Sequence, residues 1–279
     1  MAADANPWST HRRRAEQLRG RYPFAAEVLG LYRGLVDVWH QTWTLAVEDR
    51  PRPGELPDWS VSQALPRVVK ATEAAGPAVL AAAVREVSPD HAVDACIEWL
   101  SGVELPPVET YLARACLRPG LAALEEAAGA AFAADPAPAG GLRCPRCGGL
   151  PQLSVRTGAD DPLVRGGRSL ACSRCDHAWS FSVSTCPSCG ETTGAKRTLY
   201  AEQYDGPIVG RPEPGPDGGP THPHVRIEGC TTCGRYLLDI DLGRDAAAVP
   251  EVDELAAVPL ALYAGDQGLT KITPNLMGF

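Results

Sequence analysis

The sequence lacks the features that membrane proteins, secreted proteins and several enzyme classes require. No apolar run approaches the roughly 20 residues that a helix needs to cross a bilayer. The first residues include arginines but no apolar stretch behind them, which is unlike a secretory signal. A phosphate-binding glycine loop, a nucleophile elbow and an HExxH motif are also missing. We therefore expect a cytoplasmic protein that is not inserted into a membrane and whose thiols stay reduced.

Charge and aromatic content argue against a nucleic-acid partner. The 279 residues carry a net charge of −8 and include only four phenylalanines. Nucleic-acid binders usually present a basic surface, and single strands are often held by stacking on aromatic rings. Arginines do outnumber acidic residues within 143–197. An ion held by four thiolates is formally anionic, so we interpret these arginines as local charge compensation.

Eight of the ten cysteines form four CxxC pairs. Two cysteines at this spacing can direct both sulfurs inward at a tight turn, and two such turns complete a tetrahedral site for zinc or iron. Because thiols stay reduced in the cytoplasm, a disulfide framework is not expected. The pattern predicts two metal sites built from Cys144/Cys147, Cys172/Cys175, Cys186/Cys189 and Cys230/Cys233.

Each CxxC turn is called a knuckle below, and the four knuckles can pair around two ions in two ways. In the sequential pairing, site 1 contains Cys144, Cys147, Cys172 and Cys175, and site 2 contains Cys186, Cys189, Cys230 and Cys233. In the rival pairing, the second and third knuckles share one ion and the outer two share the other. We prefer the sequential pairing, because each unit then opens with CPxCG and closes with a knuckle that follows a β-prone run. Ligand type does not separate iron from zinc.

The other thiols and the histidines are expected to have no metal-binding role. Cys96 and Cys116 lie among apolar residues of helical segments, so we interpret them as buried structural thiols. His40 and His91 have no cysteine or glutamate at ligand spacing. His177, His222 and His224 are not needed as ligands, because eight cysteines already complete both sites.

Periodicity predicts an α+β protein with an all-α N-terminal part followed by two rubredoxin-like or zinc-ribbon β modules and a C-terminal helix. Ser9 or Thr10, Ser60 and Ser88 are the expected helix starts, while 118–120 and Pro259 are expected breaks. The expected parts are a helical domain at 1–134, a linker at 135–141, ribbons at 142–183 and 184–243 with a mobile loop at 205–223, and a C-terminal helix and tail at 244–279.

Closed sites of this kind argue against catalysis. A catalytic zinc keeps one coordination position open, whereas four cysteines leave none. Redox-active CxxC pairs usually lie at a helix N-terminus, but three of these four run directly into glycine, as turns between strands do. We expect a protein that is not an enzyme, with a tandem zinc-ribbon nucleic-acid adaptor and a dithiol oxidoreductase as the alternatives.

Three segments together resemble one known family. The runs CPRCGGLPQLSV, SLACSRCDHAWSFSVSTCPSCG and VRIEGCTTCGRYLLDID follow in order, and the tail contains Asp253-Glu254-Leu255 and later Pro274-Asn275. This order is similar to that of the formate dehydrogenase accessory protein (FdhE) family. The chain departs from the family at Ala171 and Leu238, where histidine and lysine are frequent, and in the inserted loop at 205–223.

The resemblance implies an assembly role. Members of the family are non-catalytic cytoplasmic factors needed for active respiratory formate dehydrogenase. The resemblance further implies that this chain binds the catalytic subunit of formate dehydrogenase before export and carries iron bound by cysteine.

Overall fold

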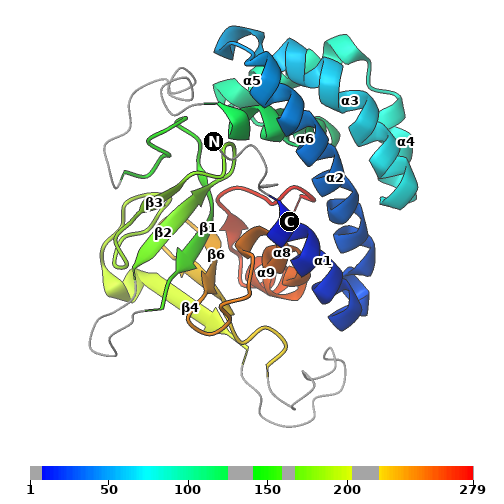
Figure 1. Cartoon of the computed structure of the whole chain (residues 1–279). Coiled ribbons are helices and arrows are strands. Elements are labelled where there is room, and N and C mark those ends of the chain that lie inside the picture. Colours follow the sequence, from blue (N-terminus) through cyan, green and yellow to red (C-terminus); the bar gives the residue numbers. More distant parts are fainter. Residues whose placement is uncertain (1–7, 125–140, 159–166, 203–219, 279) are drawn as a thin grey trace.

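The computed structural model of the protein describes residues 8–124, 141–158, 167–202 and 220–278. Helices form one side of the molecule and a sheet forms the other, with the C-terminal helices between them (Figure 1). The expected α+β class is confirmed. In this part of the chain, no helix combines the length and the apolar character that crossing a bilayer requires.

Two predicted segments fall largely outside the described residues. The linker expected at 135–141 is described only at Gly141, and the loop expected at 205–223 only at its last four positions, 220–223. A helix is expected to reach residue 134, but the described helix ends at Ala123, Leu124 has an extended backbone, and the remainder of the expected helix lies outside the described residues.

The N-terminal part is a layer of packed helices. They are α1 (Ser9–Arg21), α2 (Ala26–Asp49), α3 (Leu56–Ala75), α4 (Ala78–Arg85), α5 (Pro89–Ser101) and α6 (Pro107–Ala123), with 3-10 turns η1 (Pro23–Ala25) and η2 (Pro53–Glu55). The predicted cap at Ser88 is confirmed, since its hydroxyl accepts a hydrogen bond from the His91 N–H at 3.3 Å.

The helix start predicted at Ser60 is wrong, whereas the first helix does begin at Ser9, as predicted, but without Ser9 or Thr10 as its cap. Helix α3 begins at Leu56, a turn before Ser60, because Pro57 suits the first turn and Ser60 is buried inside the helix. Helix α1 has Trp8 in its N-cap position instead of Ser9 or Thr10. The Trp8 ring lies 6.1 Å from that of Trp39, so aromatic packing fixes where the helix begins.

Helix α6 continues through the predicted break at 118–120. Proline in a helix leaves the carbonyl four residues earlier without its usual donor. Here the indole N–H of Trp39 donates to that carbonyl, Ala115 O, at 2.9 Å. Gly120 also allows close packing, because a Cβ there would lie 2.7 Å from Leu56. Contacts with distant residues therefore allow the helix to continue through Pro119, where the local sequence predicts that it ends.

The sheet joins the two predicted ribbons into one surface. Its strand order is β3-β2-β1-β6-β5-β4, with β7 beside β6. Within each ribbon neighbouring strands are antiparallel, whereas β1 and β6 pair in parallel and connect the ribbons. The strands are β1 (Pro151–Arg156), β2 (Arg168–Cys172), β3 (Ala178–Ser180), β4 (Arg197–Ala201), β5 (Val225–Cys230), β6 (Arg235–Asp241) and β7 (Thr270–Lys271), and a 3-10 turn η4 (Gly194–Lys196) precedes β4.

Apolar and charged residues alternate across the β1–β6 seam. Leu153 pairs with Leu238, and both belong to a buried cluster that includes Leu260. Their neighbours Ser154 and Asp239 point to the opposite face and share a hydrogen bond of 2.6 Å. On that face arginines from three strands pair with two buried carboxylates, through the contacts Arg156–Glu228, Arg156–Asp239, Arg168–Glu228 and Arg226–Asp239.

The predicted C-terminal helix is interrupted near Pro259, as expected, and forms α8 (Pro250–Ala256) and α9 (Val258–Asp266). Helix α8 contacts α1, α2 and β1, so it lies between the helical layer and the sheet (Figure 1). It carries three acidic side chains that each meet a cation from a different segment: Arg118–Glu251 from α6, Arg14–Asp253 from α1 and Lys271–Glu254 from β7.

The support that Trp39 gives to Pro119 can be measured. Replacing Trp39 with Phe keeps a ring but leaves the buried Ala115 carbonyl without a donor, so we expect a loss of about 1–3 kcal/mol in the free energy of unfolding. In a Pro119→Ala background the alanine N–H supplies that hydrogen bond, and Trp39→Phe should cost clearly less. Urea denaturation of the wild type, both single variants and the double variant measures this coupling. An equal cost in both backgrounds would contradict the explanation.

Candidate metal centres

The eight cysteines of the CxxC pairs lie in two groups of four. Within each group the ligand atoms all lie within 4.8 Å of one another. The structure groups Cys144, Cys147, Cys172 and Cys175 at site 1, and Cys186, Cys189, Cys230 and Cys233 at site 2. The grouping is the sequential one, and the first and fourth knuckles do not meet.

The sulfur separations fit a tetrahedral thiolate site. Four sulfurs about 2.3 Å from a central ion lie about 3.8 Å from one another. In site 1 the Sγ atoms of Cys144 and Cys175 are 3.8 Å apart and those of Cys147 and Cys172 are 3.4 Å apart, and in site 2 those of Cys189 and Cys230 are 3.9 Å apart. The ten cysteines are all free thiols. Both groups therefore suit zinc or iron equally well, because each metal accepts four thiolates in this geometry.

Each knuckle closes with a residue in the left-handed backbone region. Gly148, Gly190 and Gly234 have φ values of 69°, 79° and 66°, and each donates its N–H to the carbonyl of the first cysteine of its knuckle. Glycine adopts this conformation without a steric penalty. The turn also points backbone N–H groups at sulfur, as in the 3.4 Å contact from Arg174 N to Cys172 Sγ. Such donors favour the thiolate form that a metal ion needs.

The second knuckle ends in Asp176, with φ of 58°, where the other three have glycine. A non-glycine residue in this region costs roughly 1 kcal/mol. Its carboxylate lies 2.9 Å from the guanidinium of Arg118 on α6, and that guanidinium also pairs with Glu251 of α8. Burial raises the pKa of Asp176. Burial also acts to raise the pKa of Glu251, but Arg118, His11 and the hydrogen bond to Asp176 together outweigh it and lower that pKa to about 2. The aspartate thus ties the knuckle to the helical layer.

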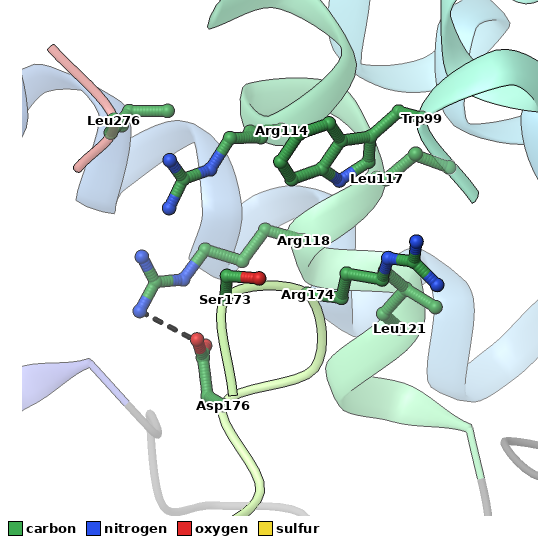
Figure 2. Close-up of a pocket in the computed structure, with 9 residues that line it drawn as sticks. All are labelled: Trp99, Arg114, Leu117, Arg118, Leu121, Ser173, Arg174, Asp176 and Leu276. Atoms are coloured by element: carbon green, nitrogen blue, oxygen red, sulfur yellow. Dashed lines mark ion pairs between the residues drawn. The ribbon is translucent and has the colours of Figure 1, made fainter. Parts of the chain in front are cut away.

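Site 1 lies at the junction between the helices and the sheet. Its four cysteines belong to the same buried cluster as Leu117 and Leu121 of α6. Arg146 of the first knuckle donates to the carbonyl of Leu124 just beyond α6. The second knuckle faces the same helix, with the Arg118–Asp176 ion pair between them (Figure 2). A cavity of only about 10 Å³ remains between these surfaces.

Site 2 lies away from the helical layer, where knuckles precede β4 and connect β5 to β6. Cys189 is exposed and Cys233 is half-buried, while Cys186 and Cys230 are buried. The two knuckles are held together by polar contacts such as the hydrogen bond of 2.8 Å from the Thr232 hydroxyl to Glu191. The N–H groups of Cys233 and Thr232 help lower the pKa of Cys230 to about 7, although its burial acts in the opposite direction.

The remaining thiols are buried, as expected. Cys96 and Cys116 are both fully buried within the helical layer. Burial raises the pKa of Cys96 to about 12 and that of Cys116 well above its ordinary value. Both thiols therefore stay protonated and unreactive at neutral pH.

Two histidines expected in a loop are instead buried at the helix–sheet junction. His222 packs its ring 4.7 Å from that of Tyr22, and His224 bonds to Asp253 at 2.8 Å. His224, Asp245 and Asp253 lie close enough together to suggest a cation site. The guanidinium of Arg14 already lies 2.5 Å from Asp253 and 2.6 Å from Asp245, so an arginine supplies the positive charge there. No sequence pattern points to this cluster, apart from the acidic residues that precede Leu255.

In comparisons with known proteins, the chain is similar in sequence to FdhE homologs. No protein-family model matches it. An FdhE homolog of Aquifex aeolicus is 29% identical over 137 residues, covering 49% of this chain and 41% of the relative. An FdhE homolog of Pseudomonas putida is 32% identical over 141 residues, covering 50% of this chain and 40% of the relative. The chain thus spans about two fifths of the length of the curated relatives that it matches.

The likeness in fold extends much further than the likeness in sequence. The crystal structure of the FdhE protein from Pseudomonas aeruginosa superimposes with a TM-score of 0.63 over 98% of this chain and 95% of the other, at 21% identity. The resemblance to the FdhE family is confirmed. The FdhE fold therefore extends over both the helical layer and the sheet of this chain.

Loss of a single ligand tests the grouping in this FdhE-like chain. We expect Cys144→Ser to reduce the bound metal from two ions to one and to leave site 2 filled, because the two groups share no ligand. Elemental analysis of the purified protein, with circular dichroism as a check on folding, measures this. Cys96→Ala is the matched control and should keep both ions. A folded Cys144→Ser protein that lost both ions, or the ion at Cys230 and Cys233, would contradict the grouping.

Acid should lower the free energy of unfolding by protonating His222, which is buried where the helical layer meets the sheet. Burial, together with His224 and Arg21, lowers the pKa of His222 from 6.5 to about 4. A histidine whose pKa is lower in the folded state stabilises the fold fully above pH 6.5 and loses that contribution as pH falls towards 4. The loss should reach about 3 kcal/mol. His222→Phe keeps the ring contact with Tyr22 and should reduce the decline in the free energy of unfolding between pH 6.5 and 4.

The difference in the free energy of unfolding between the wild type and His222→Phe excludes the effects of acid that the two proteins share. Release of metal from thiolates affects both proteins alike, and His11, whose pKa burial lowers to about 4, keeps part of the slope in the variant. His91→Gln, at an exposed position, serves as the control. Parallel pH profiles for the wild type and His222→Phe would show that His222 carries no such contribution.

Proposed function

We propose that this protein is a cytoplasmic accessory factor for the maturation of respiratory formate dehydrogenase. In this role it binds the catalytic subunit and carries two metal ions, each held by four cysteines. The observation that carries the proposal is the pair of four-cysteine groups within a chain of which 98% matches the fold of the FdhE crystal structure. The order of the CxxC motifs and the curated relatives support the same role.

We propose a carrier or structural role for the metal ions and no catalysis by them. A tetrahedral set of four thiolates fills the coordination of zinc or iron and leaves no position for substrate or water. The resemblance to the family favours iron, with zinc as the other metal that the same sulfur geometry accepts.

A tandem zinc-ribbon protein that binds nucleic acid is the alternative. Such a protein needs arginines that are free to reach phosphates. Here Arg156, Arg168 and Arg226 lie against the buried carboxylates of Glu228 and Asp239, within the chain itself. These pairs favour the accessory role over the alternative, which would show itself as salt-sensitive retardation of nucleic acid in a gel.

The proposed partnership is tested by capture of the client. Affinity-tagged protein, loaded with metal and kept reduced and free of oxygen, is mixed with the catalytic subunit of formate dehydrogenase from the same organism in its form before export. We expect the subunit to be retained, and Cys144→Ser to retain less of it than the control Cys96→Ala. If the wild-type protein, with both ions bound, retained no catalytic subunit, the proposed client would be refuted.

A further inference from the structure

The two metal centres differ in what covers them. Every cysteine of site 1 is at most 5% exposed, whereas Cys189 of site 2 is exposed and Cys233 is half-buried. We infer that site 2 exchanges its ion with acceptors in solution, and that site 1 keeps its ion and fastens the helical layer to the sheet. This inference rests on the proposed binding of two ions and assigns a separate task to each.

The neighbourhood of site 1 closes it on several sides. A Cβ at Gly149 would lie 2.8 Å from Cys172 Sγ and 3.1 Å from the side chain of Arg174, so the backbone is packed directly against the sulfur. The guanidinium of Arg174 also reaches the carbonyl of Cys147 at 3.4 Å and links the two knuckles. The cavity of about 10 Å³ beside Asp176 has room for roughly one water molecule, which is too small for a chelating group.

The neighbourhood of site 2 is open. A Cβ added to Gly190 or Gly234, the glycines that close its two knuckles, would meet nothing within 4 Å. The fourth knuckle makes polar contacts, from the Thr232 hydroxyl to the Glu191 carboxylate and from the Thr231 hydroxyl to the Lys196 carbonyl, and Cys189 is exposed. An incoming ligand therefore has a direct approach to the ion along the Cys189 side.

The chemistry of exchange depends on this approach. A thiolate or nitrogen ligand of the acceptor forms a bond to the ion as the bond to Cys189 breaks, and the released thiolate takes a proton from water. Repetition at the other three cysteines moves the ion to the acceptor without a change in its oxidation state. The partner is thus a molecule that presents soft sulfur or nitrogen donors. Site 1 cannot follow the same route until Asp176 and Arg118 separate.

The test follows the release of zinc from the zinc-loaded wild-type protein. An excess of a chromophoric chelator records the ion as it leaves, and N-ethylmaleimide labels each cysteine as it becomes free, for mapping by mass spectrometry. We expect two phases of one ion each, with the slower phase at least about tenfold slower. The cysteines of the fast phase should be Cys186, Cys189, Cys230 and Cys233.

Two variants separate the roles of the sites. Cys189→Ser should abolish the fast phase and leave the slow phase unchanged. Asp176→Asn keeps a residue that tolerates the left-handed backbone but removes the carboxylate facing Arg118, so it should accelerate the slow phase alone. An Asp176→Asn protein with an unchanged slow phase would overturn the fastening role of site 1.

The outcomes distinguish this inference from the proposed function. Two bound ions released in a single phase, or labelling of Cys172 and Cys175 before Cys189, would overturn the inference and leave the accessory role standing. A folded, reduced protein that binds no ion at either site would overturn both.

Discussion

The arrangement of the whole molecule depends on three acidic side chains of one short helix, of which Asp253 and Glu254 are buried and Glu251 is half-buried. Glu251, Asp253 and Glu254 lie on α8 between the helical layer and the sheet. Each is paired with a cation supplied by another part of the chain, from α6, α1 and β7. Removal of one partner from a buried pair such as Arg14–Asp253 or Lys271–Glu254 costs about 3–5 kcal/mol, because the remaining charge stays buried without compensation. The pairs therefore specify one relative position of helices and sheet.

That position explains why two similar metal units have different surroundings. Both ribbons follow the same plan of knuckle, two strands, knuckle and strand, and the parallel pairing of β1 with β6 joins them in one sheet. The helical layer packs on the first ribbon, through Arg118 and Asp176, and leaves the knuckles of the second open. The chemical difference between the sites arises from their neighbours, since their ligands are identical.

Two of the arginines near the cysteines have a different role from the one that the excess of arginine in this segment suggested. The sequence alone led us to interpret them as compensation for the charge of thiolate-bound ions. In the structure, Arg156 and Arg168 neutralise Glu228 and Asp239 on the sheet instead. Arg174, by contrast, lies at the site itself and bridges its two knuckles. Spacing along the chain does not distinguish these roles, because each partner carboxylate is far away in the sequence.

The sequence by itself determined the features that depend on neighbouring residues. The two-residue spacing of the cysteines, the glycine after three knuckles and the alternation in runs such as RSLAC determined the knuckles and the strands, because turns and pleats are local. Only the tertiary structure decided the continuation of α6 through Pro119, the burial of His222 and the burial of site 1. Each of these depends on a distant partner, namely Trp39, Tyr22 and α6 itself, which no local pattern encodes.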